Sequence, residues 1–171
     1  MQRIAQFFKV SKEQFIKDAI NLGFNKSNQE LEQIYNEIQL PVRSTSQSAG
    51  NDFKSPFCVE LKPGESIVIP TGIRAKIDDG FVLLIFPRSS LGFKYRMQLD
   101  NTCGIIDADY YYGNNEGHIM VKISNQSNDI NKILTINYQD KFCQGLFIPF
   151  GITVDDDVKT VRTGGIGSTG K

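Results

Sequence analysis

The chain has 171 residues, of which 40% are hydrophobic, and it carries 19 basic and 19 acidic side chains. This length suits one domain with a sizeable core. The balanced charge argues against a surface that binds DNA, RNA or acidic lipid directly, although a small anion would need only a local cluster of positive charge.

The N-terminal segment, residues 1–40, has the pattern of two short amphipathic helices. Ser11 followed three residues later by Gln14 predicts a capping box, with Val10 and Phe15 placed as a hydrophobic staple. A DNA-reading helix-turn-helix is one interpretation, but the segment has as many acidic as basic residues. We favour a helical extension packed on the body of the protein or on a neighbouring subunit.

A second start signal predicts the second helix. Ser27 is followed three residues later by Glu30, again the pattern of a capping box. Apolar residues then recur at helical spacing and would form one buried face: Leu31, Ile34, Tyr35 and Ile38. Pro41 predicts that the helix ends before it.

Residues 41–160 have the pattern of a β protein. Short runs rich in β-branched and aromatic residues alternate with Gly, Pro and Asp, as in IVIP, GIRAKI, FVLLIF, HIMVKIS and KFCQGLFIPF. No helical stretch is predicted between them. This pattern indicates an antiparallel sandwich, a jelly roll or a small barrel.

The C-terminal segment, residues 161–171, is rich in glycine. Its last residues, GIGSTGK, fit the start of a phosphate-binding loop, but such a loop needs a strand before it and a helix after the lysine. We therefore reject an ATPase. Backbone N–H groups of successive glycines could still hold an anion, and a disordered polar tail is the alternative.

The three cysteines, Cys58, Cys103 and Cys143, are widely spaced, form no CxxC motif and accompany a single histidine. Neither a zinc site nor a disulfide framework is expected, and reduced thiols favour a cytoplasmic protein. The sequence contains no signal-peptide core and no apolar run of membrane-spanning length, so we expect no membrane partner.

Five short stretches follow one another in an informative order. They are SAGNDF (48–53), PRSSLG (87–92), GIIDADYYYG (104–113), KFCQG (141–145) and RTGGIGSTG (162–170). Taken alone, the third stretch would be interpreted as the solvated end of a hairpin. Together, the five resemble the motifs of the homotrimeric dUTPase family, whose members hydrolyse dUTP to dUMP and pyrophosphate.

The resemblance covers about residues 40–171. It implies a mainly β fold, an antiparallel jelly-roll-like β barrel over residues 41–160, with the two-helix extension before it. It also implies that a flexible glycine-rich arm, residues 161–171, closes a neighbouring subunit's site. The implied substrate is dUTP, the implied cofactor is Mg²⁺, and the implied assembly is a homotrimer with shared active sites.

In the third motif, the resemblance assigns the water-activating base to Asp107, because hydrolysis of a phosphoanhydride needs an oriented, deprotonated water. Tyr110 matches the tyrosine that lies beneath the deoxyribose and fills the space of a 2′-hydroxyl. Asp109 is then a structural or pKa-setting neighbour. Two residues, Tyr111 and Tyr112, stand where the family often has one before the motif's glycine.

The base pocket is implied by the same register: Asn101, Gly104 and Ile106 would line it, with Gly104 leaving room for the ring. Asn101 could otherwise be an ordinary turn residue. Ile166 stands where the family usually has a phenylalanine that stacks on uracil. An aliphatic cover excludes water but lacks base–aromatic stacking, so we expect a looser lid.

The triphosphate needs cations and hydrogen-bond donors. The resemblance supplies eight phosphate-binding residues: Arg88, Ser89, Ser90, Gln144, Arg162, Gly167, Ser168 and Thr169. Arg162 lies one residue nearer Ile166 than in many family members, and Lys141 stands where arginine is common. Asp52 would support the metal site indirectly, from its outer shell.

Two rival functions stay open at this point. A dCTP deaminase of the same fold would activate water against the base instead of the phosphate. A dUTP-gated module would use its nucleotide-bound form to bind a protein partner, with residues 1–40 as extra surface.

Overall fold

The computed structural model describes residues 2–160, 162 and 164. The helices are α1 (Lys12–Asn21), α2 (Asn28–Glu37), α3 (Ser89–Tyr95) and the 3₁₀ helix η1 (Ala108–Tyr112). The strands are β1 (Ala5–Lys9), β2 (Val42–Arg43), β3 (Asn51–Lys54), β4 (Val59–Leu61), β5 (Ser66–Pro70), β6 (Ile73–Ile77), β7 (Phe81–Pro87), β8 (Met97–Leu99), β9 (Gly104–Ile106), β10 (Met120–Asn125), β11 (Leu134–Ile136) and β12 (Lys141–Pro149).

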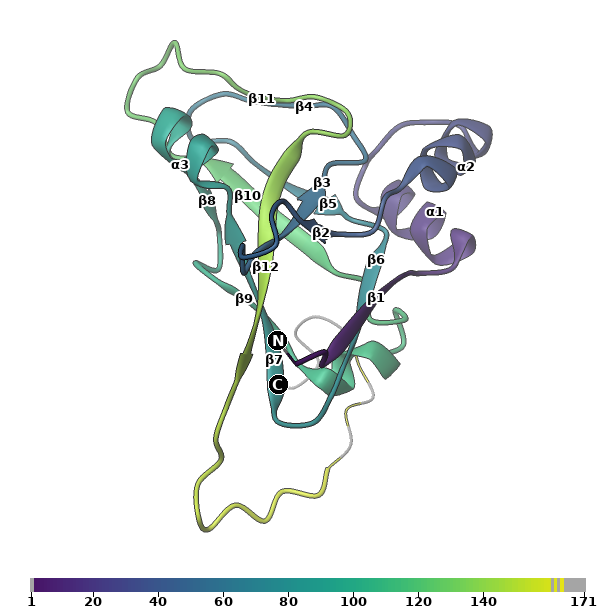
Figure 1. Ribbon diagram of the computed structural model, residues 1–171. Helices are drawn as coiled ribbons and strands as arrows, with labels where there is room; N and C mark the ends of the chain where they lie inside the picture. The colour runs from purple at the N-terminus through teal and green to yellow at the C-terminus, as the bar shows by residue number, and fades with distance from the viewer. Residues whose placement is uncertain (1, 161, 163, 165–171) are drawn as a thin grey trace.

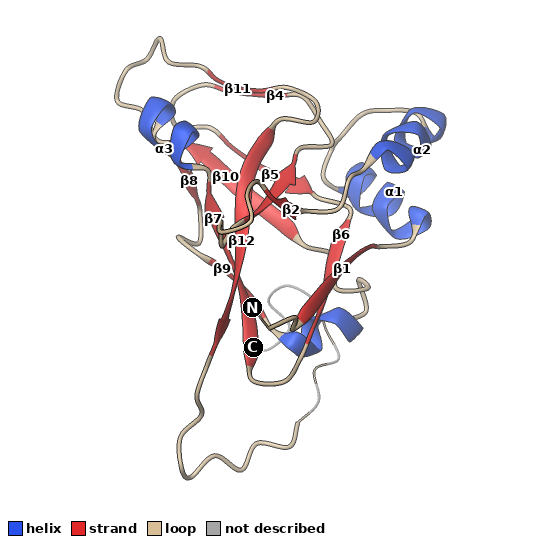
Figure 2. Cartoon of the chain, viewed as in Figure 1, coloured by secondary structure: helices blue, strands red, loops and turns tan. Residues whose placement is uncertain are grey.

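The strands form antiparallel sheets, as the sequence pattern predicts (Figures 1 and 2). The largest sheet has the order β2-β3-β12-β7-β9, and a second has the order β5-β10-β8. The pairs β1-β6 and β4-β11 form two smaller sheets. Among the residues that the structure describes, these sheets do not join into one closed hydrogen-bonded barrel.

Strand β12 is the long central strand of the largest sheet, with β3 on one side and β7 on the other. Gly145 lies where these three strands meet. A Cβ atom there would lie 2.8 Å from Leu83 Cδ1 and 3.0 Å from Phe53 Cε2, so the close packing of β12 requires glycine. Strand β7 is an almost continuous apolar run, and it holds the edge strand β9 at the side of the cavity described below.

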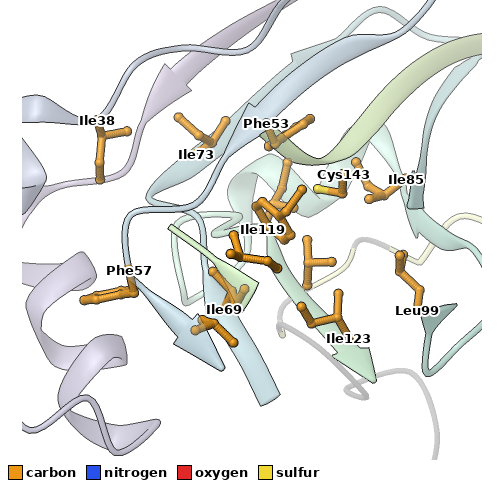
Figure 3. Packing of buried hydrophobic residues seen from close by; sticks show 14 of the residues in the cluster. Ile38, Phe53, Phe57, Ile69, Ile73, Ile85, Leu99, Ile119, Ile123 and Cys143 are labelled. Atoms are coloured by element: carbon orange, nitrogen blue, oxygen red, sulfur yellow. The ribbon is translucent and has the colours of Figure 1, made fainter. Parts of the chain in front are cut away.

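The core joins the sheets to the N-terminal helices (Figure 3). Phe15 of α1 stacks on Phe57 with ring centroids 6.0 Å apart, and Phe24 stacks on the same ring at 3.9 Å. Cys143 of β12 is buried in this core. The helices therefore share the hydrophobic core of the sheets and are not a separate layer.

Helix α1 begins after Ser11, the predicted N-cap, whose hydroxyl accepts a hydrogen bond from the Gln14 amide. The reciprocal half of the predicted capping box is wrong. The Gln14 side chain donates to Asp18 instead, and the Ser11 amide donates to Glu116, 105 residues away. The Glu116 carboxylate, distant in sequence, therefore takes the place of the Gln14 side chain as acceptor for the Ser11 amide.

Helix α2 has the complete capping box that the sequence predicts. The Ser27 hydroxyl accepts from the Glu30 amide, and the Glu30 carboxylate accepts from the Ser27 amide at 2.8 Å. Both helices lie on the same side of the molecule (Figure 1). No helix within the described part of the chain is long and apolar enough to span a membrane.

The strand β1 was missed by the sequence analysis, which assigned only helices to this segment. It pairs with β6 in a register that places Ala5 opposite Ile77. The Phe7 ring lies 5.5 Å from both the Phe53 and Phe147 rings. Five residues carry too little periodicity to identify a strand when the partner is distant in sequence.

Candidate active site

A cavity of about 500 Å³ lies against strand β9. It brings together six residues that the sequence analysis assigned to the site: Asn101, Gly104, Ile106, Asp107, Tyr110 and Arg162. Apolar side chains of β5, β7 and β10 complete the wall, among them Val68, Ile85 and Val121. The pocket combines an apolar lining with a few polar groups, as small-molecule sites commonly do.

Gly104 lies at the wall of this cavity, where a side chain would be crowded. A Cβ atom at this position would lie 3.1 Å from Ile85 Cβ and 4.0 Å from Asn101 Nδ2. Gly104 pairs with Ile85 in β7, and β9 is the edge strand of its sheet. An edge strand presents backbone donors and acceptors that no other strand uses, and such groups can read the polar edge of a base.

Asp107 follows β9 and occupies the N-cap position of η1. Arg162 Nη2 lies 2.6 Å from Asp107 Oδ2, and Arg162 Nε lies 3.0 Å from Asp109 Oδ1. Arg162 therefore compensates the repulsion between two carboxylates that are close in sequence. Its guanidinium carbon also lies 5.7 Å from the centroid of the Tyr110 ring, as in a cation–π contact.

Tyr110 lines the cavity and is buried. Its hydroxyl donates to the His118 carbonyl at 2.8 Å and accepts from Asn115 Nδ2 at 2.8 Å. Burial raises the pKa of Tyr110, so the phenol is neutral and can donate. The ring is thus held in one orientation by two hydrogen bonds.

Three residues that the sequence did not predict support this site: His118, Asn115 and Arg74. Arg74 Nη2 donates to the Tyr111 carbonyl at 2.7 Å, and its guanidinium carbon lies 3.7 Å from the Tyr111 ring centroid. These contacts hold Tyr111, one of the two residues that separate Tyr110 from Gly113. The sequence offered no signal for them beyond the presence of a single histidine.

A second group of predicted residues gathers at the ends of β3, β7 and β12. The Asp52 side chain pairs with the Arg88 guanidinium and lies 2.8 Å from Lys141 Nζ. It also accepts from the Ser44 hydroxyl at 2.6 Å. Burial works to raise the pKa of Asp52, but the hydrogen bonds from Lys141, Ser44 and Arg88 hold it below its usual value.

Gln144 lies opposite Asp52 in the β12-β3 pair. Its Nε2 donates to the Pro87 carbonyl at 3.3 Å. A Cβ atom on Gly50 would lie 2.5 Å from Gln144 Oε1, so the glycine of the first motif makes room for this amide. Ser89 and Ser90, both exposed, begin α3 directly after Arg88.

The two groups occupy different ends of strand β7. Ile106 pairs with Leu83, so Asp107 lies near Val82, whereas Arg88 follows the opposite end of the strand. Six residues at roughly 3.3 Å each separate these positions by about 20 Å. The remaining predicted residues, Ile166, Gly167, Ser168 and Thr169, lie outside the described residues.

A metal would find no preformed protein cage in the described residues, which contain no cluster of three or more His, Cys, Asp or Glu side chains suited to a metal ion. The Asp52 carboxylate already accepts from three donors. The residues present therefore suit Mg²⁺ only if substrate phosphates and water supply its ligands.

Comparison with known proteins identifies the family. A family model described as dUTPase matches residues 36–170. The deoxyuridine 5'-triphosphate nucleotidohydrolase of Lactococcus lactis subsp. lactis (strain IL1403) is 40% identical over 136 residues, which cover 78% of this chain and 89% of the relative. The enzyme of the same name from Hahella chejuensis (strain KCTC 2396) is 37% identical over 143 residues, which cover 79% of this chain and 89% of the relative.

Solved structures agree. The dUTPase from Streptococcus mutans superposes with a TM-score of 0.61 at 36% identity and covers 68% of this chain and 90% of its own. The dUTPase from phage phi11 of S. aureus covers 94% of this chain and 99% of its own, with a TM-score of 0.63. Its identity to this chain is 22%, so it supports the fold alone. A mutant of that phage enzyme coordinates a structural Mg(II) ion. The chain belongs to the dUTPase family.

Proposed function

We propose that this chain hydrolyses dUTP to dUMP and pyrophosphate. The observation that carries the proposal is the cavity at β9, where Asp107, Tyr110 and the glycine of a sheet edge meet. The relatives named deoxyuridine 5'-triphosphate nucleotidohydrolase support the same substrate. Removal of dUTP would limit uracil in DNA, and the reaction would supply dUMP.

In this proposal Asp107 orients and deprotonates the water that attacks the α-phosphorus in line with the leaving pyrophosphate. Its side chain is 48% exposed, which leaves it accessible to water. Arg162 bonds only one carboxylate oxygen, Oδ2, of Asp107. When bound, Mg²⁺ would neutralise the phosphates, with Asp52 as an indirect support.

The base and sugar would occupy the β9 cavity. Backbone groups of the edge strand at Gly104 and Ile106 would read uracil, with Asn101 beside them. The Tyr110 ring would fill the space that a 2′-hydroxyl needs. Ile166, outside the described residues, would cover the base from the arm.

The phosphates would be held by a different subunit. Uracil at Gly104 and the sugar at Tyr110 direct the phosphates away from Arg88 of the same chain, about 20 Å from Asp107. We therefore propose a homotrimer. One subunit presents Arg88, Ser89, Ser90 and Gln144, a second presents the β9 cavity, and a third lends Arg162, Gly167, Ser168 and Thr169. In that assembly the Arg162 of a neighbouring subunit would replace the Arg162 that meets Asp107 within this chain.

Three further expectations belong to this proposal. The antiparallel sheets would approximate the family's jelly-roll-like barrel, and residues 161–171 would act as an arm that closes a neighbour's site. Residues 1–40 would be an extension of residues 41–160, joined to them by the shared core. The enzyme would act in the cytoplasm.

The decisive experiment measures pyrophosphate release from dUTP, dCTP, dTTP and UTP by the wild type and by Asp107→Asn. We expect turnover of dUTP alone and a loss of about 10²–10⁴-fold in the variant. Ammonia release from dCTP would instead favour the deaminase. Full dUTP turnover by Asp107→Asn would refute the assigned base.

A further inference from the structure

We propose that Asp18 of helix α1 and the buried His118 form a positioning pair for Tyr110, and that this pair sets the discrimination between deoxyribose and ribose. The inference rests on the proposed function. Asp18 lies outside residues 36–170, the segment matched by the family model. It is not among the residues that line the β9 cavity, so it would act through Tyr110 alone.

The protonation state of His118 follows from its partners. The side chain is fully buried, and its Nε2 accepts a hydrogen bond from the Gly72 amide at 2.8 Å. Since an amide N–H can only donate, the ring proton must be on Nδ1. Nδ1 lies 2.6 Å from Asp18 Oδ2, to which it donates.

Asp18 accepts as a carboxylate. Burial works to raise its pKa, but the hydrogen bonds from His118 and Gln14 hold the pKa of Asp18 below its usual value. The two residues are 100 positions apart in sequence, so the bond ties helix α1 to the loop before β10. Both ring nitrogens are engaged, which fixes the plane of the imidazole.

The same residue holds Tyr110 through its backbone. The His118 carbonyl accepts from the Tyr110 hydroxyl at 2.8 Å, and Asn115 Nδ2 donates to that hydroxyl at 2.8 Å. The loop is also close beneath the tyrosine, because a Cβ on Gly117 would lie 2.7 Å from the Tyr110 carbonyl oxygen. A shift of His118 must therefore move Tyr110.

Helix α1 holds this loop at a second point. The Ser11 amide and hydroxyl donate to the two oxygens of Glu116 at 2.7 Å and 2.6 Å. Glu116 has a φ of 57°, an uncommon conformation for a residue with a side chain. Two attachments on one helix, at Ser11 and at Asp18, make α1 a rigid support for residues 113–118.

The consequence concerns the sugar. If the ring of Tyr110 fills the space of a 2′-hydroxyl, a looser ring admits ribose more easily and binds deoxyribose less well. Asp107 precedes Tyr110 at the N-cap of η1, and its carboxylate takes no part in the hydrogen bonds from His118 and Asn115 that hold the Tyr110 hydroxyl. Loss of the pair should therefore change KM and the dUTP/UTP ratio more than kcat.

The test compares wild type, Asp18→Ala, Asp18→Asn and Ser27→Ala. Asp18→Ala removes the acceptor, and we expect KM for dUTP to rise about tenfold and the dUTP/UTP ratio of kcat/KM to fall about tenfold. Asp18→Asn keeps a carbonyl oxygen for the Nδ1 proton and should restore most of the ratio. Ser27→Ala removes the N-cap side chain of the other helix, whose hydrogen bonds are with Glu30 of the same helix, and should leave the ratio unchanged.

The outcomes separate the two proposals. If the wild type does not turn over dUTP, the proposed function fails and the inference falls with it. If the wild type is active but the dUTP/UTP ratio of kcat/KM is the same for Asp18→Ala as for Ser27→Ala, the inference alone is overturned. If Asp18→Ala does not fold, His118→Gln makes the same comparison, because its amide oxygen can replace Nε2 as the acceptor for the Gly72 amide while no donor remains at the position of Nδ1, which faces Asp18.

Discussion

Asp52 illustrates how single residues organise the candidate site. Its carboxylate is buried, yet Arg88, Lys141 and Ser44 surround it with donors. The third-motif pair, Asp107 and Asp109, is compensated by Arg162 in the same way. In both places a like charge or a buried charge is tolerated because a cation lies within hydrogen-bonding distance.

Asp52→Asn tests this compensation through the pH dependence of stability. The native pKa of Asp52 lies below its unfolded value, so its stabilising effect is complete above about pH 4 and is lost as the pH falls through the lowered native pKa. We expect the variant to lose about 1–3 kcal/mol at pH 7. Urea unfolding of both proteins from pH 7 to pH 2 measures the difference, which should shrink with acid.

The exposed Asp79 provides the matched control. Asp79→Asn should change the free energy of unfolding by less than about 0.5 kcal/mol at either pH. An Asp52→Asn difference that stays constant from neutral to acid pH would contradict the charge-based explanation.

Gly104→Ala tests the shape of the cavity. The added methyl group would meet Ile85 Cβ at 3.1 Å and occupy space at the cavity wall. We expect KM for dUTP to rise at least about tenfold, with a smaller effect on kcat, because binding and not the attacking water is disturbed.

Gly151→Ala is the control, since a Cβ at Gly151 has no atom within 4 Å. Steady-state kinetics should therefore give a raised KM for dUTP in Gly104→Ala and an unchanged KM in Gly151→Ala. Equal KM values would mean that the base does not bind against β9.

At the level of elements, local signals were sufficient for some predictions and not for others. The box of Ser27 and Glu30 predicted the start of α2 because both partners are close in sequence. The strand β1 and the contact of Asp18 with His118 depend on partners far along the chain, so local patterns could not reveal them. The five motifs and the register just before the third one located six of the cavity-lining residues, but not the supports of Tyr110.

Phe7→Ala tests whether β1 is part of the core. The ring lies between Phe53 and Phe147, so its removal should lower the free energy of unfolding by about 2–4 kcal/mol. Gln6→Ala, in the same strand but exposed, should cost less than about 0.5 kcal/mol. If thermal unfolding gave the same loss in free energy of unfolding for both variants, β1 would contribute little to the packing of the core.

At the level of the whole molecule, the separation of the two groups of site residues has a direct test in mixed assemblies. Asp107→Asn and Arg88→Ala should each be inactive alone. If each site combines Arg88 of one subunit with Asp107 of another, subunits unfolded and refolded together in equal amounts should regain up to about a quarter of wild-type activity, because each half is intact with a probability of about one half.

Asp107→Asn mixed with Tyr110→Ala is the control, since both changes affect the same half. That mixture should stay inactive, because no subunit offers both residues intact. Absence of recovery in the first mixture would place the whole site within one chain.

The burial of Cys143 in the central strand has a practical consequence for following the opening of the molecule. Its thiol is inaccessible, and burial raises its pKa well above the usual value, which keeps it protonated and unreactive. Cys58, by contrast, is exposed. An alkylating reagent should therefore label Cys58 at once and Cys143 only when β12 separates from β3 and β7, so the labelling rate of this one sulfur reports how often the largest sheet comes apart.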